Sequence, residues 1–268
     1  MSTAPTSPHP DAVDIERLAL VGDVHGNTLW MLRTLADANG AARQGAQAAL
    51  QLGDFGIWPG TPGQRYLDDV ETVAARLSLT VYVVPGNHED WDQIDAAPRT
   101  DGVIVMRPHI VVLPTGTRWT WAGQRWVAIG GAVSIDRELR DEGKNWWPQE
   151  VISPEEAKQI IADGQVDVVA SHDAPDGITV LTHHLMVNGM AAYFPAHVMA
   201  DADAHRDLLG QIVQSIEPTH LWHGHYHHAY RDDFSLQTPR GTVKVRGLDC
   251  DGAPSLNDNM VVVDLPLN

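Results

Sequence analysis

Cysteine is almost absent from this chain, since Cys250 is the only one among its 268 residues. A single thiol excludes an intramolecular disulfide, and it excludes a structural zinc site built from several cysteines. Cysteine use therefore gives no sign of an oxidising compartment, and we expect a cytoplasmic protein.

Basic residues and long apolar runs are also scarce. The chain has 18 Lys and Arg against 35 Asp and Glu, a formal net charge of −17. Such a charge repels nucleic acid and anionic membranes at long range, so we expect stable binding to neither. No apolar run approaches the ~20 residues of a membrane-spanning helix. Residues 1–14 are rich in Pro, Ser, Thr and Ala and lack the apolar core of a signal peptide. We expect a disordered tail there and a single domain over 15–268.

What the chain does contain is a set of five short polar clusters, each at the end of an apolar, strand-like segment. The clusters are residues 22–27, 53–54, 86–89, 171–173 and 224–227, and the segments are 18–21, 48–52, 81–84, 166–170 and 220–222. Strand ends at one edge of a sheet lie close together, and α/β proteins bind their ligands there. The five clusters therefore predict one shared site.

The order of the elements indicates the fold class. Residues 16–84 alternate strands with helices at 29–36 and 64–77, which predicts a parallel sheet. Segments 110–113, 118–122 and 125–129 are typical of a meander, and three more strands are expected at 229–236, 242–248 and 260–265. Asn27 and Ser153 are the expected helix caps. We predict an α/β fold of two packed mixed β-sheets, a sandwich flanked by helices.

The clusters offer carboxylate, amide and imidazole groups, which are metal ligands. Asp23 and His25 are two residues apart, a spacing that puts side chains on the same side of an extended backbone. His225 and His227 repeat this spacing, and the two oxygens of Asp54 suit a bridge between two metals. Imidazole and oxygen ligands favour transition ions over Ca²⁺. We expect two divalent ions, Mn²⁺ ahead of Fe or Zn²⁺.

The motif order D-x-H, G-D, G-N-H-E, H, G-H-x-H over about residues 18–228 resembles the calcineurin-like metallophosphoesterases. Any one of these motifs is weak evidence, whereas all five in order are specific. The resemblance implies a two-sheet sandwich with a two-metal site and phosphoesterase activity. It assigns one metal to Asp23, His25, Asp54 and His227, and the other to Asp54, Asn87, His172 and His225.

The resemblance also implies a mechanism. Two ions clamp the phosphoryl oxygens and make hydroxide available near neutral pH, and His88 protonates the leaving group as general acid. The residue that orients His88 stays open among Glu89, Asp90 and Asp92.

The last motif contains two overlapping H-x-H pairs, because His223 precedes His225 and His227 at the same spacing. We choose His225 and His227, which follow the glycine as in the family motif. His223 then lies in the core or behind the ligands.

One departure from the family indicates the substrate class. Members that act as protein phosphatases carry Asp-Arg-Gly shortly after the G-D motif, whereas this chain has G-D-F-G-I-W-P at 53–59. A phosphodiester has a single negative charge and needs less positive clamping than a monoester. We therefore predict a phosphodiesterase acting on small phosphodiesters, with 2′,3′-cyclic nucleotides as the first choice. The alternatives are a nuclease or phosphomonoesterase of the same family, or a non-catalytic metal-binding scaffold.

The loop 134–152 is the candidate for substrate recognition. Arg137 can pair with phosphate and Trp146 can stack on a base. The alternative is a solvated, charged loop held in place by buried tryptophans, and the sequence leaves both interpretations open.

Overall fold

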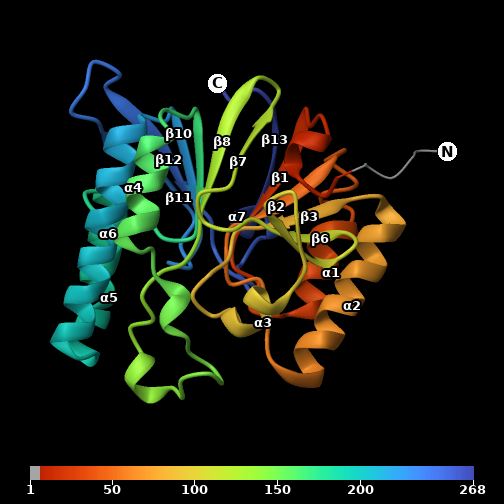
Figure 1. Ribbon diagram of the computed structural model, residues 1–268, viewed down its shortest axis with the longest axis horizontal. Helices are drawn as coiled ribbons and strands as arrows, with labels where there is room; N and C mark the ends of the chain where they lie inside the picture. The colour runs from red at the N-terminus through yellow and green to blue at the C-terminus, as the bar shows by residue number, and fades with distance from the viewer. Residues whose placement is uncertain (1–6) are drawn as a thin grey trace.

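The computed structural model describes residues 7–268, apart from the side chains of Met190 and Ala191. Two mixed β-sheets pack face to face, and helices cover their outer faces (Figure 1). This confirms the predicted fold class. Among the helices of the described residues, none is long and apolar enough to cross a membrane.

The first sheet has seven strands in the order β13-β1-β2-β3-β6-β5-β4. Strands β1, β2, β3 and β6 are parallel, and β13, β5 and β4 are antiparallel to their neighbours. The strands are β1 (Arg17–Val21), β2 (Ala48–Gln51), β3 (Thr80–Val83), β4 (Arg99–Thr100), β5 (Val103–Arg107), β6 (Ile110–Val112) and β13 (Met260–Asp264). Helices α1 (Thr28–Ala36) and α2 (Gly60–Leu77) cover its outer face, and the shorter α3 (Trp91–Ala96) and α7 (Leu256–Asn259) lie in its loops (Figure 1).

The second sheet has six strands in the order β11-β12-β10-β9-β8-β7. The strands are β7 (Arg118–Trp121), β8 (Gln124–Ile129), β9 (Val168–Ser171), β10 (His220–His223), β11 (Tyr230–Ser235) and β12 (Thr242–Gly247). Its outer face packs against α4 (Pro154–Ala162), α5 (Thr179–Asn188) and α6 (Ala196–Ile216). Asn27 and Ser153 cap α1 and α4 as predicted, and Ser153 forms a capping box with Glu156.

The core between the sheets is built around three tryptophans. Trp119 and Trp126 stack with ring centroids 5.9 Å apart, and Trp121 packs edge-on against both. Leu18 and Leu20 of β1 are fully buried against this cluster, while Ala19 and Val21 point to the helices on the other face. Because both faces of β1 are covered, its sequence is a continuous apolar run rather than an alternating one.

The predicted meander is wrong in one respect. β6 pairs in parallel with β3 in the first sheet, whereas β7 and β8 form a hairpin in the second. The hairpin turn places Ala122 and Gly123 at positive φ, as a two-residue turn between twisted strands requires. The chain crosses between sheets after β6, and strand spacing carries no information about which sheet a strand joins.

We predicted a disordered tail over residues 1–14, but part of this segment has regular structure. A short 3₁₀ helix, Pro10–Ala12, packs on β7. The carbonyl of Pro10 accepts a hydrogen bond from the indole of Trp121, and the Asp11 carboxylate accepts one from the Thr120 amide. A buried indole N–H needs an acceptor, and this segment supplies it. Residues 1–6 lie outside the described residues.

Candidate metal centre

Six of the predicted ligands form two groups at the ends of β1, β2, β9 and β10. Asp23, His25 and His227 make one group, and Asp54, His172 and His225 make the other. Within each group the potential ligand atoms all lie within 4.8 Å of one another. Asn87, from the end of β3, joins the second group, because its Oδ1 lies 2.9 Å from Nε2 of His172.

Asp54 lies between the two groups. Its Oδ2 is 3.6 Å from Nε2 of His25, and its Oδ1 is 3.5 Å from Nε2 of His172. Each oxygen of one buried carboxylate therefore faces a different group, which is the arrangement that a bridging ligand needs.

Hydrogen bonds behind the ligands fix the orientation of two imidazoles. His172 donates from Nδ1 to the Leu52 carbonyl, and His25 donates from Nδ1 to Oδ1 of Asp251, each at 2.8 Å. In the neutral rings Nε2 then carries a lone pair that points at the carboxylates and at Asn87. Acceptors that converge in this way repel one another unless a cation lies between them.

Strained backbone is concentrated at this site. Of the eight non-glycine residues with positive φ in the described chain, four are candidate ligands: His25 at 48°, Asp54 at 53°, His225 at 67° and His227 at 49°. Such conformations cost about 1–3 kcal/mol each and persist only where the surroundings impose them. The backbone at His225 and His227 is therefore not extended, which lets the two rings face different groups.

Glycines bring the motif backbones up to the ligand atoms. A Cβ on Gly224 would lie 2.1 Å from Oδ1 of Asp23, and one on Gly53 would lie 2.1 Å from Nδ1 of His172. No other residue type fits at either position, which gives the glycine of each motif a physical role.

The structure also decides between the two overlapping H-x-H pairs. His223 is buried on β10, where its Nδ1 donates to the Gly224 carbonyl and its Nε2 accepts from the Tyr230 hydroxyl. Burial lowers its pKa to about 4, so it stays neutral. His223 is a core residue, and His225 and His227 are the pair that faces the two groups.

The charges at the site favour cations. Burial opposes protonation of His25 and His172, but the nearby Asp54 and Asp23 outweigh it and raise the pKa of each ring to about 9. Oδ2 of Asp23 is buried, and Nε2 of His227 lies 3.2 Å from it. Divalent metals would replace the ring protons and neutralise these carboxylates, so the residues fit the two-metal site that the sequence predicts.

A buried network that the sequence analysis missed supports the second group. The carboxylate of Asp173 accepts hydrogen bonds from Nδ1 of His205 on α6, at 2.7 Å, and from the Tyr226 hydroxyl, at 2.5 Å. The ring of Tyr226 packs edge-on against His225, with centroids 4.8 Å apart. Asp173 belongs to a predicted cluster, but His205 lies in an amphipathic helix and gives no local signal. Asp251, behind His25, likewise follows no motif.

Glu89 has a different role from the one considered for it. Its carboxylate accepts backbone hydrogen bonds from Phe55, Gly56 and Ile57 and so shapes the loop after Asp54. Burial and then the charge of Asp54 raise its pKa to about 7. Asp90 caps α3. Neither carboxylate contacts the His88 ring in a way that would orient it.

His88 lies beside the carboxylate of Asp54. Its Nε2 is 3.9 Å from Oδ2 of Asp54, and its backbone N–H donates to Oδ1 of the same residue. Burial lowers the pKa of His88, with Asp54 opposing and the positive charge of Arg140 adding to the decrease. Arg140 itself donates two hydrogen bonds to Asp136, at 2.7 and 2.8 Å.

Arg137 and Trp146 are the predicted substrate contacts in the loop 134–152, and their part in substrate binding stays a prediction. Arg137 pairs with Asp201 and ties the loop to α6. The indole nitrogen of Trp146 is buried. The loop is anchored to the site through Ser134, which accepts a hydrogen bond from Nδ2 of Asn87 and donates to Glu150. The loop arginine whose charge lowers the pKa of His88 is Arg140. From the sequence, Arg137 and not Arg140 was predicted as a substrate contact.

Comparison with known families agrees with this geometry. A family model described as calcineurin-like phosphoesterase matches residues 16–229. The chain belongs to the calcineurin-like phosphoesterase family. A search of curated proteins finds no match. Family membership and the two groups of His and Asp ligands together identify a metal-dependent phosphoesterase.

Proposed function

We propose that this phosphoesterase hydrolyses small phosphodiesters, with 2′,3′-cyclic nucleotides as the first candidates. The observation that carries the proposal is the position of Asp54 between two ligand groups, with His88 beside it. When bound, two divalent metals supply charge stabilisation at the phosphoryl oxygens and a nucleophile at neutral pH. Mn²⁺ is the proposed metal, since the ligands are imidazoles and oxygens.

The proton for the leaving group comes from His88. Burial and Arg140 lower its pKa, so the protonated ring is a strong donor. An anionic phosphodiester bound beside the ring favours the protonated form. His88 then transfers the proton to the leaving oxygen as the phosphorus–oxygen bond breaks.

The charge near His88 supports a diester rather than a monoester. Among the nearby cations, Arg140 lowers the pKa of His88 most. The Asp136 carboxylate pairs with the Arg140 guanidinium through two hydrogen bonds. The pair adds little net positive charge where a phosphate would lie. A singly charged diester needs less compensation than a doubly charged monoester, and the short family arginine motif is absent at 53–59.

A hydrolysis panel tests the proposal. The Mn²⁺-loaded protein is assayed against bis-p-nitrophenyl phosphate, p-nitrophenyl phosphate, 2′,3′- and 3′,5′-cyclic AMP, and a single-stranded oligonucleotide. We expect diesters to be preferred and 2′,3′-cyclic AMP to be cleaved. The protein treated with a chelator is the control and should be inactive.

Three results would contradict the proposal. Preference for the monoester would show that Arg140 or another cation clamps a dianion. Rapid cleavage of the oligonucleotide would make the protein a nuclease despite its net charge. Two bound metals with no turnover of any compound would favour the binding scaffold.

A further inference from the structure

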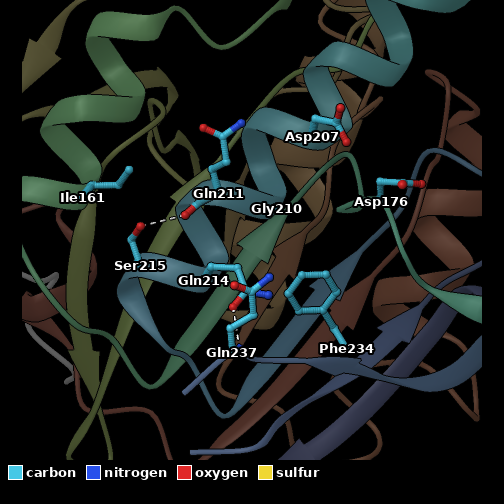
Figure 2. A pocket seen from close by; sticks show the side chains of 9 residues that line it. All are labelled: Ile161, Asp176, Asp207, Gly210, Gln211, Gln214, Ser215, Phe234 and Gln237. Atoms are coloured by element: carbon cyan, nitrogen blue, oxygen red, sulfur yellow. Dashed lines mark hydrogen bonds between the residues drawn. The ribbon is translucent and has the colours of Figure 1, made fainter. Parts of the chain in front are cut away.

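Two hollows lie away from the metal ligands. One, of about 620 Å³, lies beside α6 and β11 (Figure 2). Gln214 donates to the Ser235 carbonyl and accepts from the Gln237 amide, and Ser215 donates to the Gln211 carbonyl. The side chains of Asp207, Gln211 and Gln237 also line this hollow, but they are exposed to water and do not select a ligand.

The second hollow, of about 660 Å³, has a different lining. It lies between the second sheet and the end of the first, and its walls include Trp222, Arg231, Lys244, Arg246, Val263 and Asn268. Its volume is in the range of small-molecule sites. Three of the chain's 18 basic residues and two acidic residues, Asp232 and Asp233, line this one space in a protein with a net charge of −17.

Two arginines stand directly opposite each other there. Arg231 of β11 and Arg246 of β12 are register partners in an antiparallel pair, so their side chains leave the sheet on the same face. Like charges in this arrangement destabilise a sheet. Arg246 is half-buried, and burial together with the charge of Arg231 lowers its pKa to about 10.

No carboxylate among residues 7–268 pairs with either arginine, although Asp233, the register partner of Lys244, also lines the hollow. Within residues 7–268, neither guanidinium makes an ion pair or a hydrogen bond, and Arg246 lies over the Trp222 ring at 5.0 Å. The neighbouring Asp232 carboxylate is used elsewhere, because it accepts from the amides of Val180 and Asp233. Lys244 donates to the backbone oxygen of Asn268. The two arginines thus face each other without a direct counter-ion among the described residues.

We propose that this hollow is a second binding site, separate from the metal centre, for a phosphate-bearing anion held between Arg231 and Arg246. Two guanidinium groups side by side match the oxygens of a phosphate, and each offers paired N–H donors. The Arg246 guanidinium also packs on the Trp222 ring, which limits its movement. The bound anion removes the repulsion between the two cations.

The proposal is tested by thermal unfolding and calorimetric titration of the metal-loaded protein with inorganic phosphate and with AMP. Arg231→Gln and Arg246→Gln remove one cation each, and Arg43→Gln, an exposed arginine between α1 and β2, controls for net charge. Phosphate at the metal centre contributes equally to all four proteins, so the difference between them reports on the hollow.

We expect wild type and Arg43→Gln to bind one more phosphate than the two hollow variants, or to bind it roughly tenfold more tightly. Without phosphate, Arg231→Gln should raise the melting temperature, since it removes a like-charge contact. Diester hydrolysis should be unchanged in both hollow variants. Tighter binding of AMP than of phosphate would identify a nucleotide as the source of the anion. The same phosphate response in all four proteins would overturn the proposal. Arg231 is exposed, so Arg231→Gln is expected to fold and can be tested even if Arg246→Gln misfolds.

Discussion

At the scale of single residues, the site depends on imidazole rings whose orientation is fixed by their neighbours. His88 is the residue that we expect to act on the substrate directly. His88→Asn should lower kcat by about 10²–10⁴-fold, because it removes the proton donor and leaves the ligand groups intact. Steady-state kinetics on the best diester measures this. Two metals per chain by elemental analysis is the necessary control, and near-normal kcat with metals bound would remove His88 from the mechanism.

Asp251 should act through His25 and not on the substrate. Asp251→Ala removes the acceptor that orients the His25 ring, and loss of such a partner costs about 10–100-fold in metal affinity. Asp251→Asn keeps an acceptor oxygen and should recover most of the affinity. Calorimetric titration with Mn²⁺ compares the three proteins. Equal affinity in wild type and Asp251→Ala would show that the hydrogen bond does not position the ligand.

His223 should make the fold sensitive to acid. Its pKa falls from 6.5 to about 4 on folding, so the unfolded chain binds more protons between these values. Stability therefore decreases as the pH falls from 6.5 towards 4, by about 1.4 kcal/mol per pH unit for this group. His223→Gln should flatten that part of the profile. Urea unfolding with chelator present, at pH 4.5 to 7, measures it, and parallel profiles for both proteins would contradict the assignment.

At the scale of elements, the loops after β1 and β2 meet at two glycines. A Cβ on Gly56 would lie 2.3 Å from Cα of Gly26, whereas one on Gly102 would meet nothing within 4 Å. Both residues have positive φ, at 115° and 85°. Gly56→Ala should therefore destabilise the protein by about 1–3 kcal/mol more than Gly102→Ala does, because it adds overpacking to the same kind of backbone strain.

Urea unfolding of the two alanine variants isolates the contact between the loops. We also expect Gly56→Ala to weaken Mn²⁺ binding, since His25 and Asp54 flank the contact. Equal unfolding free energies for the two variants would show that the loops adjust without cost.

The sequence was informative wherever a motif follows a strand. The ends of β1, β2, β3, β9 and β10 were placed to within a residue or two, and these ends position Asp23, Asp54, Asn87 and the other candidate ligands. Parallel strands with both faces buried have a continuous apolar pattern, so the sequence shows clearly where each strand ends. The pairing of β6, by contrast, depends on which sheet it reaches, and no local pattern records that.

For the same reason, the sequence could not predict the residues that hydrogen-bond to the ligands and their neighbours from behind. His205 contacts Asp173 across 32 positions of the chain, and Asp251 contacts His25 across 226. Such contacts depend on tertiary structure alone. Arg137 and Arg140 illustrate the limit, because they are similar in sequence context, yet one pairs with Asp201 on α6 and the other lies near His88.

At the scale of the whole molecule, two sheets bring their parallel strand ends to a common edge. Clusters from residue 23 to residue 227 converge there, and the carboxylates of Asp23 and Asp54 are buried among the imidazoles of the site. The excess of acidic residues is therefore partly a property of the site. Metal binding is expected to reduce it locally while the surface stays acidic.

An anomalous difference map from crystals grown with Mn²⁺ would show directly whether the protein holds two metals. We expect two peaks, one among Asp23, His25 and His227 and one among Asp54, Asn87, His172 and His225, with Asp54 in contact with both. A single peak, or peaks away from these residues, would contradict the two-metal centre on which the proposed activity rests.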